Sequence, residues 1–174
     1  GTVWVPAGNY LIDADTTIRL RSNVTFHMED TTAQLFAKPT SSERFVILLV
    51  ANVSNVNIIG GKLVGDRNQH LGTTGEWGMG IAVYGSSNIN IRGTKIINCW
   101  GDGVVVGATT RYNAPGVSTA VILKNVVCEN NRRQGLTIGK ARNVLVDSCT
   151  FNYTNGTKPM AGIDIEPDSD TAQD

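Results

Sequence analysis

The chain is poor in net charge, in residues that favour helices and in long apolar stretches. Its 15 basic side chains balance its 15 acidic ones, so it lacks the basic excess typical of charge-driven nucleic-acid binders. No apolar run approaches the roughly 18 residues of a membrane span, and no stretch of about 10–15 residues shows amphipathic helical periodicity. We therefore expect no nucleic-acid partner, no membrane span, and neither a helical bundle nor a doubly wound α/β fold.

Cysteine is also scarce. Cys99, Cys128 and Cys149 have no metal-ligand spacing, and their odd number leaves at least one thiol free. All three lie in or beside apolar segments, which favours buried structural thiols. The sequence contains no phosphate loop, zinc motif or catalytic Ser/His/Asp order, so we predict no cofactor and no resident metal.

Turn-forming and β-branched residues are abundant. The 174 residues include 19 glycines, 18 threonines and 16 asparagines, against five glutamates, and Val and Ile dominate the apolar set. β-Branched side chains favour strands, whereas Gly and Asn favour tight turns. The composition therefore indicates an all-β protein with many short strands.

Two short units alternate along the chain. The first unit has the form Ser/Arg-Asn-apolar-x-apolar, with a degenerate copy at 119–123. Its other copies are residues 22–26, 54–58, 87–91 and 142–146. The second unit, x-Gly-apolar-x-apolar, has its copies at residues 79–83, 102–106, 134–138 and 161–165. A third short apolar element follows the first unit, so each turn of the repeat contains three short strands.

One such coil cannot bury its apolar face, so the coils must stack, about 4.8 Å apart and joined by parallel strand pairing. The sequence thus predicts a single-stranded right-handed parallel β-helix of about five to six coils. One inward column would contain Ile81, Val104, Leu136 and Ile163, and another Leu63, Ile96, Cys128 and Phe151. Asn98 and Asn130 would form a stacked corner. A propeller or sandwich, the alternative, needs regular hairpin turns that we do not find.

Three strings resemble those of one known superfamily. Residues 1–10, GTVWVPAGNY, resemble the opening segment of pectin-lyase-like right-handed β-helix proteins, and NNRRQG (130–135) and GIDIEP (162–167) resemble strings of a bacterial and phage branch. The resemblance covers nearly the whole chain. It implies a polysaccharide partner, a secreted, extracellular or virion-surface location, and a homotrimer if the protein is tailspike-like. The relatives' N-terminal cap is missing, so we expect residues 1–174 to be a single β-helix domain, cut from a longer protein without its natural caps.

Because side chains fill the interior of a β-helix, a site must lie on the outer wall or in inserts. Asp164 and Glu166 are two residues apart on a strand, so they share a face with Cα atoms about 6.6 Å apart. Carboxylates at such spacing suit the acid–base or nucleophile–acid pairing of glycoside cleavage. Asp102 lies two coils away, about 10 Å along the axis, and we predict it as the third catalytic carboxylate. The alternatives are that these carboxylates only solvate the wall and that Asp102 is an Asp-Gly corner.

Other outward positions suggest substrate contacts. We predict that Arg132 and Arg133 bind a uronate or sulfate, with ion pairs to the carboxylates of the next coil as the alternative. Trp77, Trp100 and Tyr84 would offer faces to sugar rings, although both tryptophans could instead pack at corners.

A polar, glycine-rich insert at 65–78 lies beside the Trp77 column and could wall the groove. His70 and Glu76 are its titratable candidates for substrate binding. The alternative for His70 is a loop side chain that is merely solvated.

Strings that mark particular enzymes of the superfamily are absent. We find neither the Gly-His-Gly and Arg-Ile-Lys strings of polygalacturonases nor the vicinal Asp pair of calcium pectate lyases, and Asp-Ile-Glu-Pro at 164–167 stands where mannuronan epimerases have Asp-Pro-His. The resemblance therefore implies polysaccharide cleavage by a hydrolase or lyase without deciding the reaction. Two other functions remain open: a non-catalytic glycan-binding or tailspike module, and a structural shaft. Calcium bound by a carboxylate cluster around Asp164 is the alternative to a metal-free site.

Overall fold

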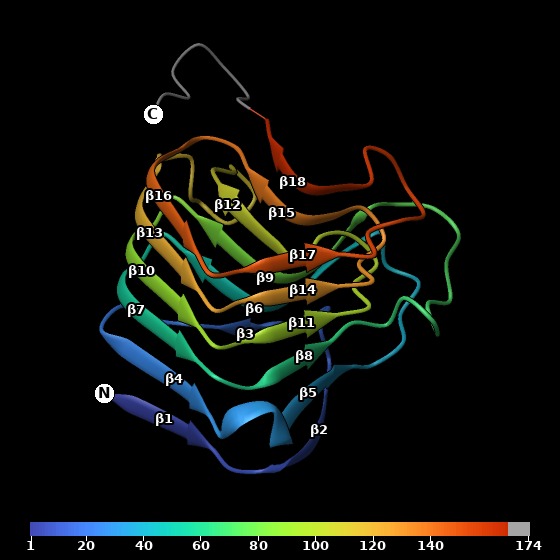
Figure 1. The fold of residues 1–174 in the computed structure, drawn as a ribbon, viewed down its shortest axis with the longest axis horizontal. Coiled ribbons are helices and arrows are strands. Elements are labelled where there is room, and N and C mark those ends of the chain that lie inside the picture. The colour runs from blue at the N-terminus through green and yellow to red at the C-terminus, as the bar shows by residue number, and fades with distance from the viewer. Residues whose placement is uncertain (167–174) are drawn as a thin grey trace.

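The computed structural model describes residues 1–166, which wind into a solenoid of three parallel six-stranded sheets (Figure 1). Successive strands belong to sheets A, B and C in turn, so three strands make one coil and the described chain makes six. This confirms the predicted all-β, single-stranded parallel β-helix with three short strands per coil. In the described part of the chain, the only helical element is the 3-10 turn η1 (Asp30–Thr32).

Each sheet takes every third strand. Sheet A consists of β1 (Thr2–Val5), β4 (Val24–Met28), β7 (Ser54–Ile59), β10 (Ser87–Arg92), β13 (Ser118–Lys124) and β16 (Ala141–Asp147). Sheet B consists of β2 (Gly8–Ile12), β5 (Ala33–Ala37), β8 (Lys62–Val64), β11 (Lys95–Ile97), β14 (Val127–Glu129) and β17 (Thr150–Asn152). Sheet C consists of β3 (Ile18–Arg19), β6 (Arg44–Ala51), β9 (Trp77–Tyr84), β12 (Val104–Gly107), β15 (Gln134–Ile138) and β18 (Ala161–Ile165).

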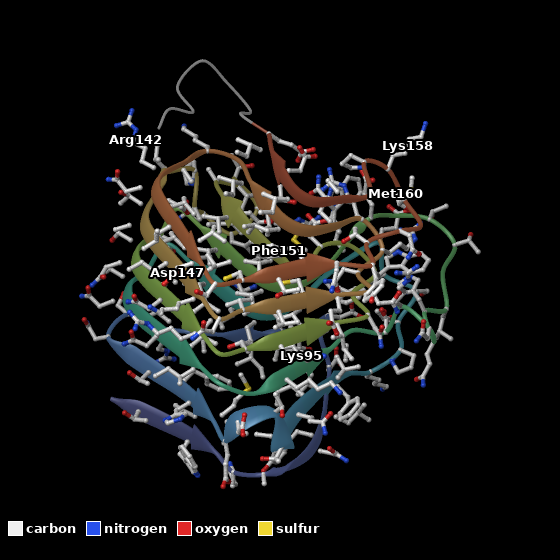
Figure 2. The ribbon with its side chains drawn as sticks, viewed as in Figure 1. Lys95, Arg142, Asp147, Phe151, Lys158 and Met160 are labelled. Carbon is white, nitrogen blue, oxygen red and sulfur yellow. The ribbon has the colours of Figure 1, made fainter. Side chains whose placement is uncertain are left out.

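The predicted inward columns are correct in register. In sheet C, Val104 pairs with Ile81 and with Leu136, which in turn pairs with Ile163. In sheet B, the column from Leu63 through Ile96 and Cys128 to Phe151 is formed in the same way, and Figure 2 shows the Phe151 side chain on its strand. The first three members of each column are fully buried. Stacking like residues excludes water from one continuous core without any layer of helices.

Asparagine corners separate the strands. Asn98 and Asn130 have left-handed φ angles of 57° and 53°, and the Asn130 Nδ2 donates to Asn98 Oδ1 at 2.7 Å, as predicted. A second ladder, which the sequence analysis did not foresee, joins Asn23, Asn55 and Asn88 at the start of sheet A strands through side-chain hydrogen bonds of 2.9 and 2.7 Å. Asparagine tolerates this backbone region, and its amide can donate and accept along a stack.

The described residues contain three cysteines, none of them in a disulfide. All three thiols are free, with Cys99 and Cys128 buried in the core. Among residues 1–166, no helix has the length and hydropathy needed to cross a membrane.

Two long connections flank the outer face of sheet C. Residues 65–76 connect β8 to β9 and so precede the sheet C strand, whereas residues 108–117 connect β12 to β13 and so follow one. We call them the first insert and the second insert. Because they lie at opposite ends of sheet C strands, the outer face between them is the natural place for a groove.

Candidate functional site

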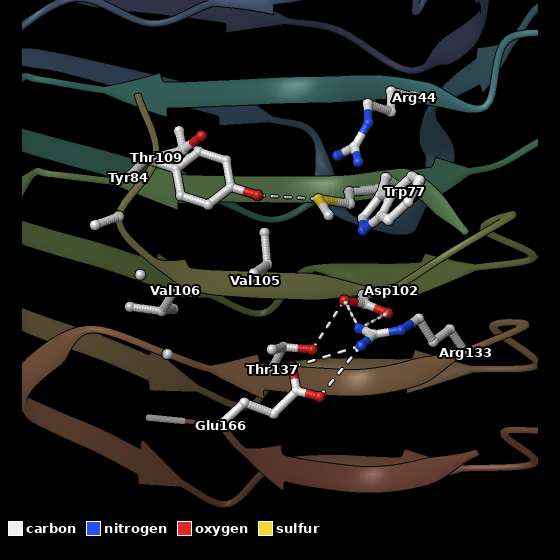
Figure 3. Close-up of a pocket in the computed structure, with 14 residues that line it drawn as sticks. Arg44, Trp77, Tyr84, Asp102, Val105, Val106, Thr109, Arg133, Thr137 and Glu166 are labelled. Carbon is white, nitrogen blue, oxygen red and sulfur yellow. Dashed lines mark hydrogen bonds and ion pairs between the residues drawn. The ribbon is translucent and has the colours of Figure 1, made fainter. Parts of the chain in front are cut away.

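A cleft of about 200 Å³ lies on the outer face of sheet C (Figure 3). Its walls come from the sheet C strands β6, β9, β12 and β15, from residues that flank these strands, from Glu166 directly after β18, and from the second insert. The lining residues are Arg44, Trp77, Met79, Tyr84, Asp102, Val105, Val106, Gly107, Ala108, Thr109, Arg133, Thr137, Gly139 and Glu166. A cavity of about 50 Å³ adjoins it near β6 and is lined in part by Arg111 and Tyr112.

The floor of the cleft is apolar at the end near β6 and β9. Five side chains that point away from the helix interior are nevertheless buried there, and they form a cluster separate from the core. They are Val46, Leu49, Met79, Ala82 and Val105. Tyr84 and Tyr112, whose rings stack with centroids 6.1 Å apart, pack on this cluster, and the Tyr84 hydroxyl donates to the Met79 sulfur at 3.3 Å. Tyrosine suits this position because its ring covers apolar surface while its hydroxyl stays hydrogen-bonded.

The other end of the cleft is polar and centred on Arg133. The Arg133 Nη1 lies 3.1 Å from Asp102 Oδ2, and its Nη2 lies 3.2 Å from Glu166 Oε1. Its Nε lies 3.6 Å from Glu76 Oε2. Burial alone would lower the pKa of Arg133, but the three carboxylates together raise it above its usual value. One guanidinium thus holds three of the predicted site carboxylates together.

Asp102 lies at the bottom of this cluster and is fully buried. Arg133 covers it, and the Thr137 hydroxyl donates to its Oδ2 at 2.8 Å. Burial raises the pKa of Asp102 to about 7, and the attraction of Arg133 and the Thr137 hydrogen bond offset this only in part. Asp102 therefore occupies the predicted outward column without being solvent-exposed, and it retains a proton at pH values where ordinary carboxyls have lost theirs.

Asp164 and Glu166 have different partners. Glu166 lines the cleft with a side chain 39% exposed and pairs with Arg133. Asp164 accepts a hydrogen bond from Gln134 Nε2 at 2.5 Å and is not part of the cleft lining. Gln134 also accepts from Arg133, which connects Asp164 to the cluster at one remove. The structure therefore joins Glu166 more directly to Asp102 than to Asp164.

His70 of the first insert stacks on Trp100, which also contacts Arg132. The Trp100 ring contacts the His70 ring, with centroids 3.9 Å apart, and the guanidinium carbon of Arg132 lies 3.8 Å from the centroid of the Trp100 ring. The His70 side chain is buried rather than solvated, and its Nδ1 is 2.7 Å from Asp66 Oδ2. Arg132 Nη1 donates to the Gly75 carbonyl at 2.8 Å. These contacts hold the insert against the coils, and none of the three stacked residues lines the cleft.

Trp77 and Glu76 stand between two hollows. Trp77 lines the cleft and also a second, open hollow of about 440 Å³, which Glu76 and Arg132 line too. Arg44 stacks on Trp77, with its guanidinium carbon 3.3 Å from the ring centroid. Of the predicted substrate contacts, Trp77, Tyr84 and Arg133 thus border the cleft, with Glu76 at its margin.

The sequence analysis missed Arg44, Thr109, Arg111 and Tyr112. Arg44 occupies the same column as Trp77, but its strand has Ile47 where the next strand has Gly80, so the glycine register could not be extended to it. The second insert could have been located from the sequence. It makes the spacing between the motif glycines Gly103 and Gly135 longer than the spacing between Gly80 and Gly103.

The calcium alternative concerns carboxylates grouped around Asp164. Among residues 1–166, no three His, Cys, Asp or Glu side chains are grouped so that they could hold a metal ion. The calcium alternative around Asp164 stays a prediction.

The fold and the cleft define a parallel β-helix protein with a groove on the outer face of one sheet. Residues 46–171 match the family described as the right handed beta helix region, and the chain belongs to that family. Two relatives come from Bacillus subtilis (strain 168). The uncharacterized protein YclG is 33% identical over 188 residues, and the SPbeta prophage-derived uncharacterized protein YorA is 31% identical over 187. The matches cover 95% and 94% of this chain but 32% of each relative, so the chain spans about a third of their length.

Two solved structures are similar in fold. A provisionally named glycosyl hydrolase from Parabacteroides merdae ATCC 43184 has a TM-score of 0.61 at 16% identity, over 91% of this chain and 84% of that one. The pre-mature gene product 12 of bacteriophage phi29 has a TM-score of 0.62 at 15% identity, over 84% of this chain and 22% of that one. At such identities the similarity establishes the β-helix fold and not a shared reaction.

Proposed function

We propose that this chain is the carbohydrate-active section of a longer β-helix protein, which binds a polysaccharide in the cleft on sheet C and cleaves it there. The observation that carries the proposal is the convergence of Asp102, Glu166 and Glu76 on Arg133, beside Trp77 and Tyr84 in the same cleft. Aromatic faces and charged hydrogen-bonding groups around one cleft are what sugar rings and hydroxyls require. The glycosyl hydrolase name of one structural neighbour supports the same class.

Two carboxyls with different environments suit glycoside hydrolysis. The pKa of Asp102, raised to about 7 by burial, lets this side chain keep a proton and act as the general acid. Glu166 is partly exposed and paired with Arg133, so it is placed to act as the base or nucleophile. Access to Asp102 requires Arg133 to move aside when substrate binds, because this guanidinium covers it. Asp164 remains the third carboxylate of the proposed site. It would act on the cluster indirectly, by positioning Gln134, which contacts Arg133.

The reaction is tested with a panel of polysaccharides. New reducing ends without ultraviolet absorbance of unsaturated sugars indicate a hydrolase, and both together indicate a lyase. Glu166→Gln and Asp102→Asn should each lower the rate by about 10²–10⁴-fold, the usual contribution of general acid–base catalysis. Glu129→Gln is the matched control, because Glu129 pairs with Lys95 on the outer face of sheet B. If both site variants retain wild-type activity, the assignment of the site is wrong.

A non-catalytic glycan-binding module is the second candidate. The burial of Asp102 beneath Arg133 and Thr137 favours it, because a locked acid cannot donate its proton to a bound sugar. The prophage origin of one relative and the phage source of one structural neighbour fit such a module at a virion surface. Retained binding without any cleavage would select this candidate. An extracellular or virion-surface location and a tailspike-like homotrimer belong to the proposal in either form.

A further inference from the structure

Three arginines lie near the end of the cleft opposite Arg133: Arg44 and Arg111 line the small cavity there, and Arg19 lies over the ring of Tyr112. Arg19 on β3, Arg44 on β6 and Arg111 in the second insert are all exposed. In the part of the chain that the structure describes, none of their guanidinium groups forms an ion pair. This distinguishes them from Arg133, whose charge is already matched by carboxylates. An unpaired positive charge beside a cleft attracts anions.

The geometry around Arg44 leaves its hydrogen-bond donors available. The guanidinium stacks on the Trp77 ring at 3.3 Å, and this contact uses the flat face of the group. The N–H donors lie in the plane of the guanidinium, so stacking orients them without occupying them. Arg111 lines the same small cavity as Arg44, Trp77 and Tyr84. The last three residues also line the main cleft, so the two hollows adjoin. Figure 3 shows Arg44 beside Trp77 at this end.

Aromatic contacts hold the second insert in place over this end. Tyr112 stacks on Tyr84, and the guanidinium carbon of Arg19 lies 5.4 Å from the centroid of the Tyr112 ring. These contacts, and the hydrogen bond from the Arg111 backbone N–H to Thr109 Oγ1 at 3.2 Å, hold the backbone of Arg111 beside the cleft. Preorganised donors cost less entropy when they bind a ligand.

We propose that Arg44 and Arg111 form a subsite for an anionic group of the glycan, a carboxylate, sulfate or phosphate. This inference rests on the proposed function and deepens it, because it makes the ligand an acidic polysaccharide and transfers recognition of its charge from Arg132 and Arg133 to the opposite end of the cleft. Arg44 and Asp102 are separated by two coils, about 10 Å along the axis. Glu166 and Glu76 would repel the anionic group, and Arg44 and Arg111 would attract it. Because these opposite charges lie at opposite ends of the cleft, they fix the direction in which the glycan lies in it.

The test compares ligands that share one backbone. Binding of neutral dextran, carboxymethyl dextran, dextran sulfate and dextran phosphate is measured by calorimetry, and the polysaccharide panel above is repeated with each acidic member beside its neutral ester. We expect an acidic ligand to bind at least tenfold more tightly than its neutral counterpart, with the preferred anion identifying the group recognised. Arg44→Gln and Arg111→Gln should each lower the affinity for the acidic ligand by about tenfold. Raising the salt concentration should reduce the difference in affinity between the acidic and neutral ligands.

Arg142→Gln is the matched control, because Arg142 is exposed on β16 in sheet A and lines neither the cleft nor the small cavity; Figure 2 labels its side chain. Arg44→Lys, which keeps the charge, should retain part of the affinity, and circular dichroism checks that each variant is folded. Equal binding of acidic and neutral ligands, or wild-type binding by the Arg44→Gln/Arg111→Gln double variant, overturns this inference while the proposed function stands. Failure of every glycan to bind overturns both.

Discussion

At the residue scale, Arg133 decides the electrostatics of the cleft. Its single charge faces Asp102, Glu166 and Glu76, so full ionisation of all three would leave the cluster with net negative charge. The most deeply buried member, Asp102, is the one whose pKa is raised, to about 7. A carboxyl that shares its only cationic partner is less well compensated than one in a simple ion pair.

Asp102 should give the protein a specific pH dependence. Its pKa in the folded state lies above the usual value of 3.8, so the folded protein keeps a proton that the unfolded chain loses. Stability from this group is complete below about pH 4 and is lost as the pH rises through about 7. We expect the free energy of unfolding of wild type, relative to Asp102→Asn, to fall over this range in urea titrations. Glu129→Gln serves as the control, because Glu129 pairs with Lys95 on sheet B, away from the Arg133 cluster. A stability difference between wild type and Asp102→Asn that does not change with pH would contradict the prediction.

At the scale of single columns and ladders, stacking repeats the same local conformation in successive coils. The left-handed corner at the start of the sheet A strands is one such position. The Asn23–Asn55–Asn88 ladder continues in position to Ala120 and Asn143, all with φ between 53° and 62°. Ala120 lies beside Asn88 in register, since Ser87 pairs with Thr119 and Ile89 with Val121. Alanine cannot continue the side-chain hydrogen bonds, and its Cβ disfavours this backbone region. Ala120 is therefore a gap in an otherwise regular corner.

Ala120→Asn should fill that gap and stabilise the protein by about 1 kcal/mol, from a better-tolerated φ and one or two restored hydrogen bonds. Chemical denaturation measures the change. Ala120→Gly separates the two causes, because glycine relieves the backbone without supplying an amide. A variant no more stable than wild type would show that the ladder contributes nothing at this corner.

Members of one inward column differ in burial, so the cost of truncating them can be compared. Leu136 is fully buried, whereas Ile163, its partner on the edge strand β18, is 47% exposed. Leu136→Ala should lower the free energy of unfolding by about 2–5 kcal/mol, because it leaves a cavity between coils. Ile163→Ala should cost clearly less, since water already reaches that side chain. Equal losses in urea unfolding would mean that β18 is better covered than its exposure indicates.

At the scale of the whole molecule, the cleft is a property of the stack. Arg44 and Glu166 lie on opposite sides of it and are 122 positions apart in the numbering, yet strand pairing brings them to one surface. Each coil contacts mainly its neighbours, so stability is close to a sum of coil and interface terms. The groove is therefore complete only while β6 to β18 remain stacked.

Hydrogen exchange should reveal this nearest-neighbour behaviour. Amides of the central strands, such as β9 and β12, should be the most protected, and those of the edge strands at both ends of the stack, such as β3 and β18, should exchange first. Mass spectrometry of peptides resolves the order. Ligands that occupy the cleft should raise protection at the β15 and β18 end, where Arg133 and Glu166 lie. Uniform exchange along the chain would indicate a single cooperative unit instead.

The repeat in the sequence determined the coil, the register and the inward columns. Motif glycines and apolar spacing can be compared between coils because stacking places equivalent positions above one another. The same register identified the columns that contain Trp77, Asp102 and Glu166. It could not reach Arg44, whose coil has Ile47 in place of the glycine.

Only the tertiary structure decided which outer residues are covered and which charges are paired. Asp102 and His70 are buried, Arg133 is matched by carboxylates, and Arg44 keeps its charge unmatched. The physical reason is that burial on the outer wall depends on side chains that meet only when the coils stack and the inserts pack: Arg133 and Thr137 cover Asp102, and the first insert places His70 against Trp100. Inserts interrupt the repeat, so the periodicity that predicts the core carries no information about them.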